Sequence, residues 1–188
     1  MTDTFLLPAI SADDSSLVEQ VCLLVNRAYT VAEAGMWRTV VERTTSAEVA
    51  KAMRDREMAV AYEEDHLVGA IRSRLVDEHT GWFGALAVDC AHGGRGVGGQ
   101  LVRFVEEQTG AAGATMMRLE VLVPLTPHPH TERLAAWYSR LGYREVGRCS
   151  LVEVDPPRGS VRGGPDRGIS HGKTSCHVGQ RLRCLLTP

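Results

Sequence analysis

The chain has few of the residues that mark secreted, membrane or nucleic-acid-binding proteins. Five of its 188 residues are cysteines, and none form a Cys-x-x-Cys pair, so neither a disulfide framework nor a zinc site is indicated. No apolar run approaches the roughly 18–20 residues that span a bilayer, and the first ten residues lack the features of a signal peptide. The net charge of −2 offers no positive patch for nucleic acid. These absences favour a cytoplasmic protein with free thiols, and neither nucleic acid nor membrane as a partner.

What is present fits one globular domain with an appendage. Hydrophobic residues make up 44% of the chain and charged residues 23%, which is typical of a protein with a real core. From residue 156 onward the composition changes to Arg, Gly and Pro with almost no acid. We therefore predict a domain over residues 1–155 and a flexible tail over 156–188. The weak alternation within 176–186 leaves open an edge strand there.

The hydrophobic periodicity predicts an α/β fold. Helical spacing follows a cap at Ser11, a cap at Thr45 or Ser46, and the glycine-rich stretch 93–99, and a fourth helix spans 132–141. Strand patterns occupy 5–10, 58–62, 67–76, 82–88, 116–123 and 143–154. The order β-α-α-β-β-β-α-β-α-β indicates a mixed sheet with a single β-α-β unit near its middle.

The glycines of residues 93–99 match two phosphate-binding patterns by spacing. A P-loop requires Lys and Ser/Thr after its last glycine, and here Gln100 follows, so that interpretation fails. A dinucleotide fingerprint requires an opening β-α-β unit and an acid ending the next strand; Glu120 has the right distance but lies inside its strand. Backbone amides at the start of a helix hold a pyrophosphate without lysine or metal, and this fits best. A tight turn without a ligand is the alternative.

Three segments carry a resemblance to a known family. "LAVDCAHGGRGVGGQLV", "LEVLVP" and "LAAWYSRLGY" resemble the GNAT family of N-acetyltransferases, over roughly residues 4–154. The resemblance implies a mixed, mostly antiparallel central sheet flanked by helices, in which the strands at 82–88 and 116–123 form a parallel, splayed pair. It also implies acetyl-CoA as co-substrate, no metal, and transfer of the acetyl group directly to an amine. A homodimer is compatible with it.

The resemblance assigns cofactor-binding residues to two neighbouring stretches. The family pattern Arg/Gln-x-x-Gly-x-Gly/Ala corresponds to Gly93-x-x-Gly96-x-Gly98, although Gly93 lacks the usual side chain and Cys90 replaces a usual proline. A final strand is also missing from the tail. The residues implied to contact the pantetheine arm are Leu86, Ala87 and Val88, and those implied at the pyrophosphate are Gly93, Gly94, Arg95, Gly96, Val97, Gly98, Gly99 and Gln100.

Two side chains have the chemistry that acetyl transfer requires. Glu120 is the candidate base, because a carboxylate in an apolar strand is costly unless paired or functional; a solvent-facing or salt-bridged Glu is the alternative. Tyr138 is the candidate acid for the departing thiolate, because phenol and thiol pKa values lie close together; it occupies the family's Tyr position. We expect Trp137 and Leu141 on the core face of its helix. Simple packing of Tyr138 on the sheet is the alternative.

The acceptor is expected near the first helices and the loop before the last one. Candidate acceptor-binding residues are Tyr29, Glu33, Trp37 and His128, each of which is equally compatible with packing. We therefore predict an acetyl-CoA-dependent N-acetyltransferase acting on a small molecule or protein amine. The alternative is a non-catalytic acyl-CoA-binding or regulatory protein of the same fold.

Overall fold

The computed structural model describes residues 1–36, 42–124, 127–150 and 175–182. The chain divides into two compact units, which we take in turn. Of the described residues, the first contains Met1–Arg118 and Leu182, and the second contains Leu119–Arg181. Within these ranges, antiparallel strands, a parallel pair and four α-helices confirm the predicted mixed α/β class.

The sheet of the first unit is a meander closed by a parallel pair. Its strands follow the order β1-β2-β3-β4-β5. The first three pairings are antiparallel, and the fourth runs parallel between Thr80–Trp82 and Met116–Arg118. The strands are β1 (Thr2–Leu6), β2 (Met58–Glu63), β3 (His66–Leu75), β4 (Thr80–Val88) and β5 (Met116–Val123), of which the last continues into the second unit.

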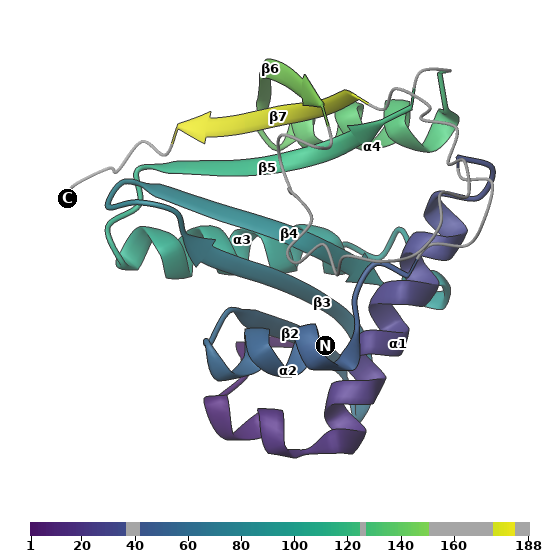
Figure 1. Cartoon of the computed structure of the whole chain (residues 1–188), viewed down its shortest axis with the longest axis vertical. Helices are drawn as coiled ribbons and strands as arrows, with labels where there is room; N and C mark the ends of the chain where they lie inside the picture. The colour runs from purple at the N-terminus through teal and green to yellow at the C-terminus, as the bar shows by residue number, and fades with distance from the viewer. Residues whose placement is uncertain (37–41, 125–126, 151–174, 183–188) are drawn as a thin grey trace, which may run out of the picture. The chain divides into compact units, whose positions relative to one another are not determined.

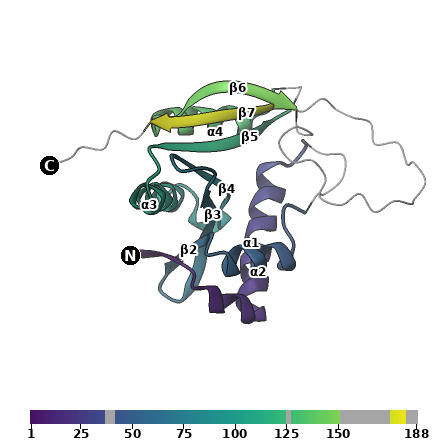
Figure 2. The same cartoon turned by 60° about the vertical axis from the view of Figure 1, so that its left-hand side comes forward.

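Helices cover both faces of this sheet (Figures 1 and 2). α1 (Ser15–Ala32) and α2 (Ser46–Arg54) pack on one face, and α3 (Val97–Ala111) packs on the other. The core under α1 and α2 is built from small and branched side chains, among them Val21, Val49 and Val60. The predicted helices at 45–53 and from 97 onward are confirmed.

The predicted start of the first helix is wrong. Residues Ala9–Asp13 form a short 3-10 helix, η1, and α1 begins only at Ser15. Asp14 is the N-cap, since its carboxylate accepts hydrogen bonds from the backbone N–H groups of Ser16 and Leu17 at 3.0 and 3.1 Å. Asp caps as well as Ser does, so the choice between Ser11 and Asp14 depends on the path of the chain before the helix. β1 likewise begins and ends earlier than predicted.

The second unit contains the rest of β5, α4 (Pro129–Arg140), β6 (Arg144–Ser150) and β7 (Ser175–Leu182). Its strand order is β5-β7-β6, with β6 and β7 antiparallel (Figure 1). The expectation that no strand closes the chain is therefore wrong. β7 is also not the edge strand that the alternation within 176–186 left open, because it lies between two others. The domain boundary at residue 155 stays a prediction.

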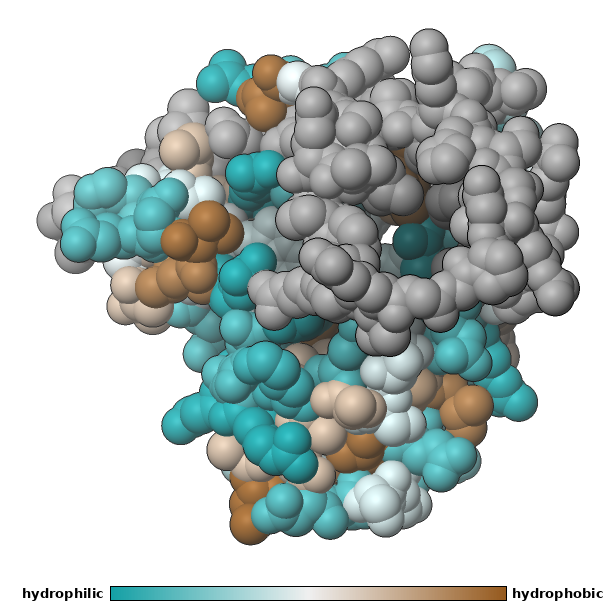
Figure 3. All heavy atoms as spheres, in the orientation of Figure 1, coloured by the Kyte–Doolittle hydropathy of each residue, from teal (hydrophilic) through white to brown (hydrophobic). Residues whose placement is uncertain are grey.

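The described surface is mainly polar on the face shown in Figure 3, where brown apolar residues stand in small groups among teal ones. The most exposed large apolar side chains after Met1 are Ile10 and Val31, at 72% and 62%, on different elements. Among the helices of the described ranges, none combines the length and apolarity needed to cross a membrane.

Candidate cofactor-binding site

The strand that leads into the glycine loop is interrupted by a bulge. Ala85 has φ 50°, in the left-handed region, and the β3–β4 register jumps from Ala70↔Ala87 to Arg72↔Gly84. Two residues of β4 therefore lie opposite one of β3, which defines a β-bulge. A bulge bends its strand and redirects the backbone polar groups that follow, here those of Leu86 onward.

Gly84, just before the bulge, is covered by an aromatic ring. A Cβ at Gly84 would lie 2.5 Å from the indole of Trp82, so only glycine lets that ring lie along the strand. The guanidinium of Arg74 lies over the same ring, 5.2 Å from its centroid, which is within cation–π range. The start of β4 is thus fixed by side-chain packing as well as by its two neighbouring strands.

The glycine loop after β4 contains two residues that require glycine. Gly94 and Gly96 have φ 77° and 89°, where a side chain costs roughly 1–2 kcal/mol. A Cβ at Gly94, Gly96 or Gly99 would meet nothing within 4 Å, so open space surrounds the backbone on this side of the loop. Gly93 has an ordinary φ of −59°, and its lack of a side chain is not demanded by the backbone.

The loop ends at the uncapped start of α3. Gly96 is the N-cap, and no side chain caps the helix within the described chain. The N–H of Gln100 donates to the carbonyl oxygen of Gly96 at 3.0 Å, so the first-turn N–H groups before it have no acceptor in the helix ladder. Val97 is buried and fixes the turn against the sheet. Because these N–H groups follow one another at the N-terminus of α3 and open space adjoins them, they are suited to bind an anion.

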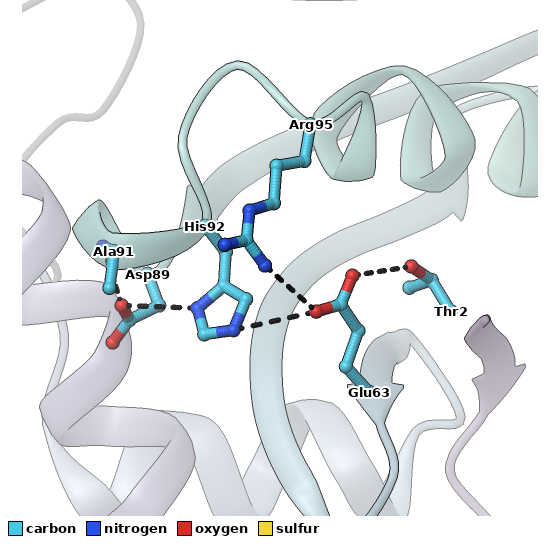
Figure 4. A network of polar contacts seen from close by, with 6 residues as sticks. All are labelled: Thr2, Glu63, Asp89, Ala91, His92 and Arg95. Atoms are coloured by element: carbon cyan, nitrogen blue, oxygen red, sulfur yellow. Dashed lines mark hydrogen bonds and ion pairs between the residues drawn. The ribbon is translucent and has the colours of Figure 1, made fainter.

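A polar network ties this loop to the β1–β2 edge (Figure 4). Asp89 caps the short 3-10 helix η2 (Cys90–His92) by accepting from the N–H of Ala91 at 2.8 Å. That bond is the main reason why the pKa of Asp89 lies below its usual value. His92 Nδ1 lies 3.4 Å from Asp89 Oδ1, and its Nε2 lies 3.5 Å from Glu63 Oε2.

Arg95 and Thr2 complete the network around Glu63. Arg95 Nη1 lies 3.5 Å from Glu63 Oε2, and the Thr2 hydroxyl donates to Glu63 Oε1 at 3.1 Å. Sequence reasoning missed Glu63, Asp89 and His92. The Asp at the end of a strand is a local signal for the cap at Ala91, whereas the contacts of Glu63 are tertiary and have no local signal.

Two of the acceptor candidates lie together at the end of α1. The carboxylate of Glu33 forms an ion pair with Arg43, whose Nε lies 3.1 Å from Oε2, and Arg43 lies 5.1 Å from the ring centroid of Tyr29. Burial raises the pKa of Tyr29 to about 12, although the charge of Arg43 opposes the rise. The negative charge of Glu33 is thus compensated within the chain. Trp37 lies outside the described residues.

The remaining candidates belong to the second unit. Glu120 is half-buried and lies on the face of β5 opposite the buried Leu119 and Val121. Tyr138 is buried, at 8% exposure, and its ring meets the edge of Tyr143 at 5.7 Å. Trp137 and Leu141, which were expected on the core face of this helix, are both only half-buried, whereas Tyr138 is buried.

His128 has a clear structural task in that unit. It is the N-cap of α4, and its Nδ1 accepts a hydrogen bond from the N–H of His130 at 3.3 Å. The helix therefore starts at Pro129, earlier than the predicted Glu132. Proline is favoured there because the first helical N–H has no partner in any case.

Within the described ranges, no three His, Cys, Asp or Glu side chains are grouped as metal ligands. The predicted cofactor-binding residues lie in two neighbouring parts of the chain: Leu86–Val88 end β4, and 93–100 follow the short helix η2. The structure also brings Tyr29 and Glu33 together through Arg43.

Comparison with known proteins agrees with this geometry. Residues 54–145 match the acetyltransferase (GNAT) domain family. A search of curated protein sequences gives no match. Among solved structures, the chain is similar to a PaiA N-acetyltransferase from Thermoplasma acidophilum in complex with coenzyme A, with a TM-score of 0.66 at 11% identity, covering 97% of this chain and 99% of that one.

Two further structures show the same fold. The ribosomal-protein-S18-alanine N-acetyltransferase from Escherichia coli gives a TM-score of 0.64 at 12% identity, covering 97% of this chain and 94% of that one. An aminoglycoside 6'-N-acetyltransferase complexed with coenzyme A gives 0.62 at 16% identity, covering 97% and 96%. Residues 54–145 therefore match the acetyltransferase (GNAT) domain family, and the chain shares the fold of these N-acetyltransferase structures.

Proposed function

We propose that this chain is an acetyl-CoA-dependent N-acetyltransferase, which moves the acetyl group directly from the CoA thioester to an amine of a small molecule or protein. The observation that carries the proposal is the open, uncapped first turn of α3, which η2 and the glycine loop join to the bulged strand β4. Anionic phosphates are the ligands that such amides favour. The CoA complexes of the similar structures support the same choice.

Each part of the proposed site would contribute a separate task. The amides of residues 94–99 would hold the pyrophosphate, with Gly93 and Gln100 at the two ends of this stretch and Arg95 as an exposed positive charge beside it. The backbone of Leu86–Val88 would pair with the pantetheine arm, and an N–H near Val88 would stabilise the oxyanion. Holding the thioester in this way lowers the barrier by fixing the geometry of attack.

Tyr138 and Glu120 would handle the protons. An alkyl amine with a pKa near 10 is mostly charged at neutral pH, so it must lose a proton before it attacks; Glu120 would accept it, directly or through water. The thiolate that leaves would take its proton from the Tyr138 hydroxyl. The acetyl carbon thus exchanges its C–S bond for a C–N bond. The ammonium nitrogen loses two protons: the first passes through Glu120 to solvent, and the second, lost as the amide forms, balances the proton that Tyr138 gives to the thiolate.

The burial of Tyr138 favours a second candidate, a non-catalytic acyl-CoA-binding protein of the same fold. A Tyr at 8% exposure in edge contact with Tyr143 is also what simple packing gives. The absent side chain at Gly93 points the same way. A cytoplasmic location, predicted from the scattered cysteines, fits both candidates.

Calorimetric titration with acetyl-CoA, with NAD and ATP as controls, tests the cofactor. We expect acetyl-CoA alone to bind. The variant Tyr138→Phe then separates the two candidates in an amine screen. An enzyme should lose about 100-fold in kcat while its affinity for acetyl-CoA changes little. No transfer to any amine by the wild-type protein, together with unchanged binding, would support the non-catalytic candidate instead.

A further inference from the structure

We infer that Glu63 is a positioning residue for the glycine loop: its carboxylate holds His92 and Arg95, and through them sets the affinity for the cofactor's pyrophosphate. The inference rests on the proposed function, because it concerns the same loop. Glu63 lies outside that loop and outside the motif, at the end of β2.

The two oxygens of the Glu63 carboxylate have different partners (Figure 4). Oε1 accepts a hydrogen bond from the Thr2 hydroxyl at 3.1 Å, which fixes the carboxylate on the β1–β2 edge. Oε2 lies 3.5 Å from both His92 Nε2 and Arg95 Nη1. The carboxylate thus links the edge of the sheet to two basic side chains of the loop.

The place of Glu63 in the sheet makes it a firm anchor. It pairs with His66 across the β2–β3 hairpin and with Thr2 of β1, so its backbone is held on both sides. The adjoining turn is tight, with Glu64 at φ 53°. The Glu63 side chain is only 26% exposed, compared with 60% for the Arg95 side chain, so the more buried partner holds the more exposed one.

The loop needs such an anchor because of its composition. Gly93, Gly94 and Gly96 lose more conformational freedom on ordering than any other residues would. No side chain of the described chain caps the helix start. The backbone of the segment before α3 is held at its start by the bond from the N–H of Asp89 to the carbonyl oxygen of Val68. The side chains of the segment are restrained by Asp89 from within and by Glu63 from outside. If the loop is already restrained before the cofactor binds, it loses less conformational entropy on binding, and the affinity is higher.

A carboxylate near a pyrophosphate site also repels the ligand, so the net effect of Glu63 depends on whether repulsion or restraint of the loop dominates. Repulsion between partly exposed charges is reduced by solvent and salt. The guanidinium of Arg95 faces Oε2 of Glu63, and its positive charge compensates the negative charge of the carboxylate. Restraint of the loop then outweighs the repulsion, and removal of Glu63 should weaken binding.

The test compares Glu63→Ala and Glu63→Gln with the control Glu64→Gln, an exposed carboxylate one residue further along. Titration with CoA and acetyl-CoA should show about three- to tenfold weaker binding for Glu63→Ala, the size expected from a few partly exposed polar contacts. Glu63→Gln keeps an acceptor oxygen and should lose less. Glu64→Gln removes the same charge and should bind like the wild type.

A coupling experiment shows whether Glu63 acts through the loop side chains. In a His92→Ala/Arg95→Ala background, Glu63→Ala should change Kd by less than about twofold, because its partners are gone. Thr2→Val removes only the hydroxyl that fixes the carboxylate, and should weaken binding less than Glu63→Ala does, because Oε2 keeps both of its loop partners.

Three results would overturn the inference. They are unchanged or tighter binding by Glu63→Ala, the same weakening in the His92→Ala/Arg95→Ala background, and equal weakening by Thr2→Val. No CoA binding by the wild-type protein would overturn the proposed function, and the inference with it. If the wild-type protein binds CoA and any of the three results is found, the inference about Glu63 fails but the proposed function stands.

Discussion

Gly96 and Gly99 are three residues apart, yet substitution by alanine should have opposite effects on them. Gly96 has φ 89°, whereas Gly99 lies in the first turn of α3, and a Cβ at either meets nothing within 4 Å. The difference is therefore one of backbone conformation and not of packing. Gly96→Ala should lower the free energy of unfolding by about 1–2 kcal/mol, and Gly99→Ala should raise it by about 0.5–1 kcal/mol.

Urea denaturation of the two variants measures this difference. If Gly96→Ala proved neutral, the loop would have relaxed to an ordinary φ, and its open amide arrangement would not be set by the sequence. Both variants also place a methyl group beside the proposed phosphate site, so CoA affinity should be measured separately from stability.

At the scale of the element, the N-terminus of α2 is the most fully capped of the helices in the described chain. The Thr45 hydroxyl accepts from the N–H of Glu48 at 3.3 Å, and the Glu48 carboxylate accepts from the N–H of Thr45 at 2.9 Å, which is a capping box. We expect Thr45→Ala to destabilise the protein by about 1 kcal/mol. Ser46→Ala is the matched control, since Ser46 is exposed and lies one residue inside the helix. Equal unfolding midpoints for the two variants would contradict the role of the box.

The same helix shows which elements a sequence predicts well. α2, α3 and the β2–β3 hairpin follow from local patterns: a cap, a periodic apolar face, or a polar turn between two apolar runs. The start of α1 is harder to predict because Ser11 and Asp14 are both good caps. α4 begins earlier than predicted because His128 is an unusual cap. β7 escapes prediction because its residues carry little apolar alternation, and its pairing with β6 is a long-range contact.

For the candidate site, the glycine loop is predictable from the sequence and its surroundings are not. The glycine spacing and the following helix are visible in the chain. The bulge at Ala85 and the network around Glu63 depend on strand registers, and no local pattern reports them. The prediction placed Trp137 on the core face of its helix, but Tyr138 is the more buried of the two. Both aromatic residues are compatible with a core face, and adjacent positions differ by only about 100° around a helix.

At the scale of the whole molecule, the C-terminal segment decides whether the domain ends at residue 155. β7 lies between β5 and β6 in the strand order, so deletion of residues 156–188 removes a strand with a neighbour on each side. We expect the truncated chain to lose hydrogen-exchange protection in β6 while α3 keeps its protection. Deletion of residues 183–188 alone is the control. Full protection of β6 in the longer deletion would instead support the boundary predicted from the sequence.

The strand order of the first unit also has a consequence for the nascent chain. β2 and β3 are joined by only two residues, Glu64 and Asp65. β1, in contrast, can pair with β2 only after η1, α1, α2 and β2 itself have been synthesised. Closure of that long segment costs more entropy than closure of the hairpin, so β1 joins the sheet late. Until then it is an unpaired strand that other chains can recruit. The polar residues Thr2, Asp3 and Thr4 make it a poor template for such aggregation, and the same Thr2 later orients Glu63.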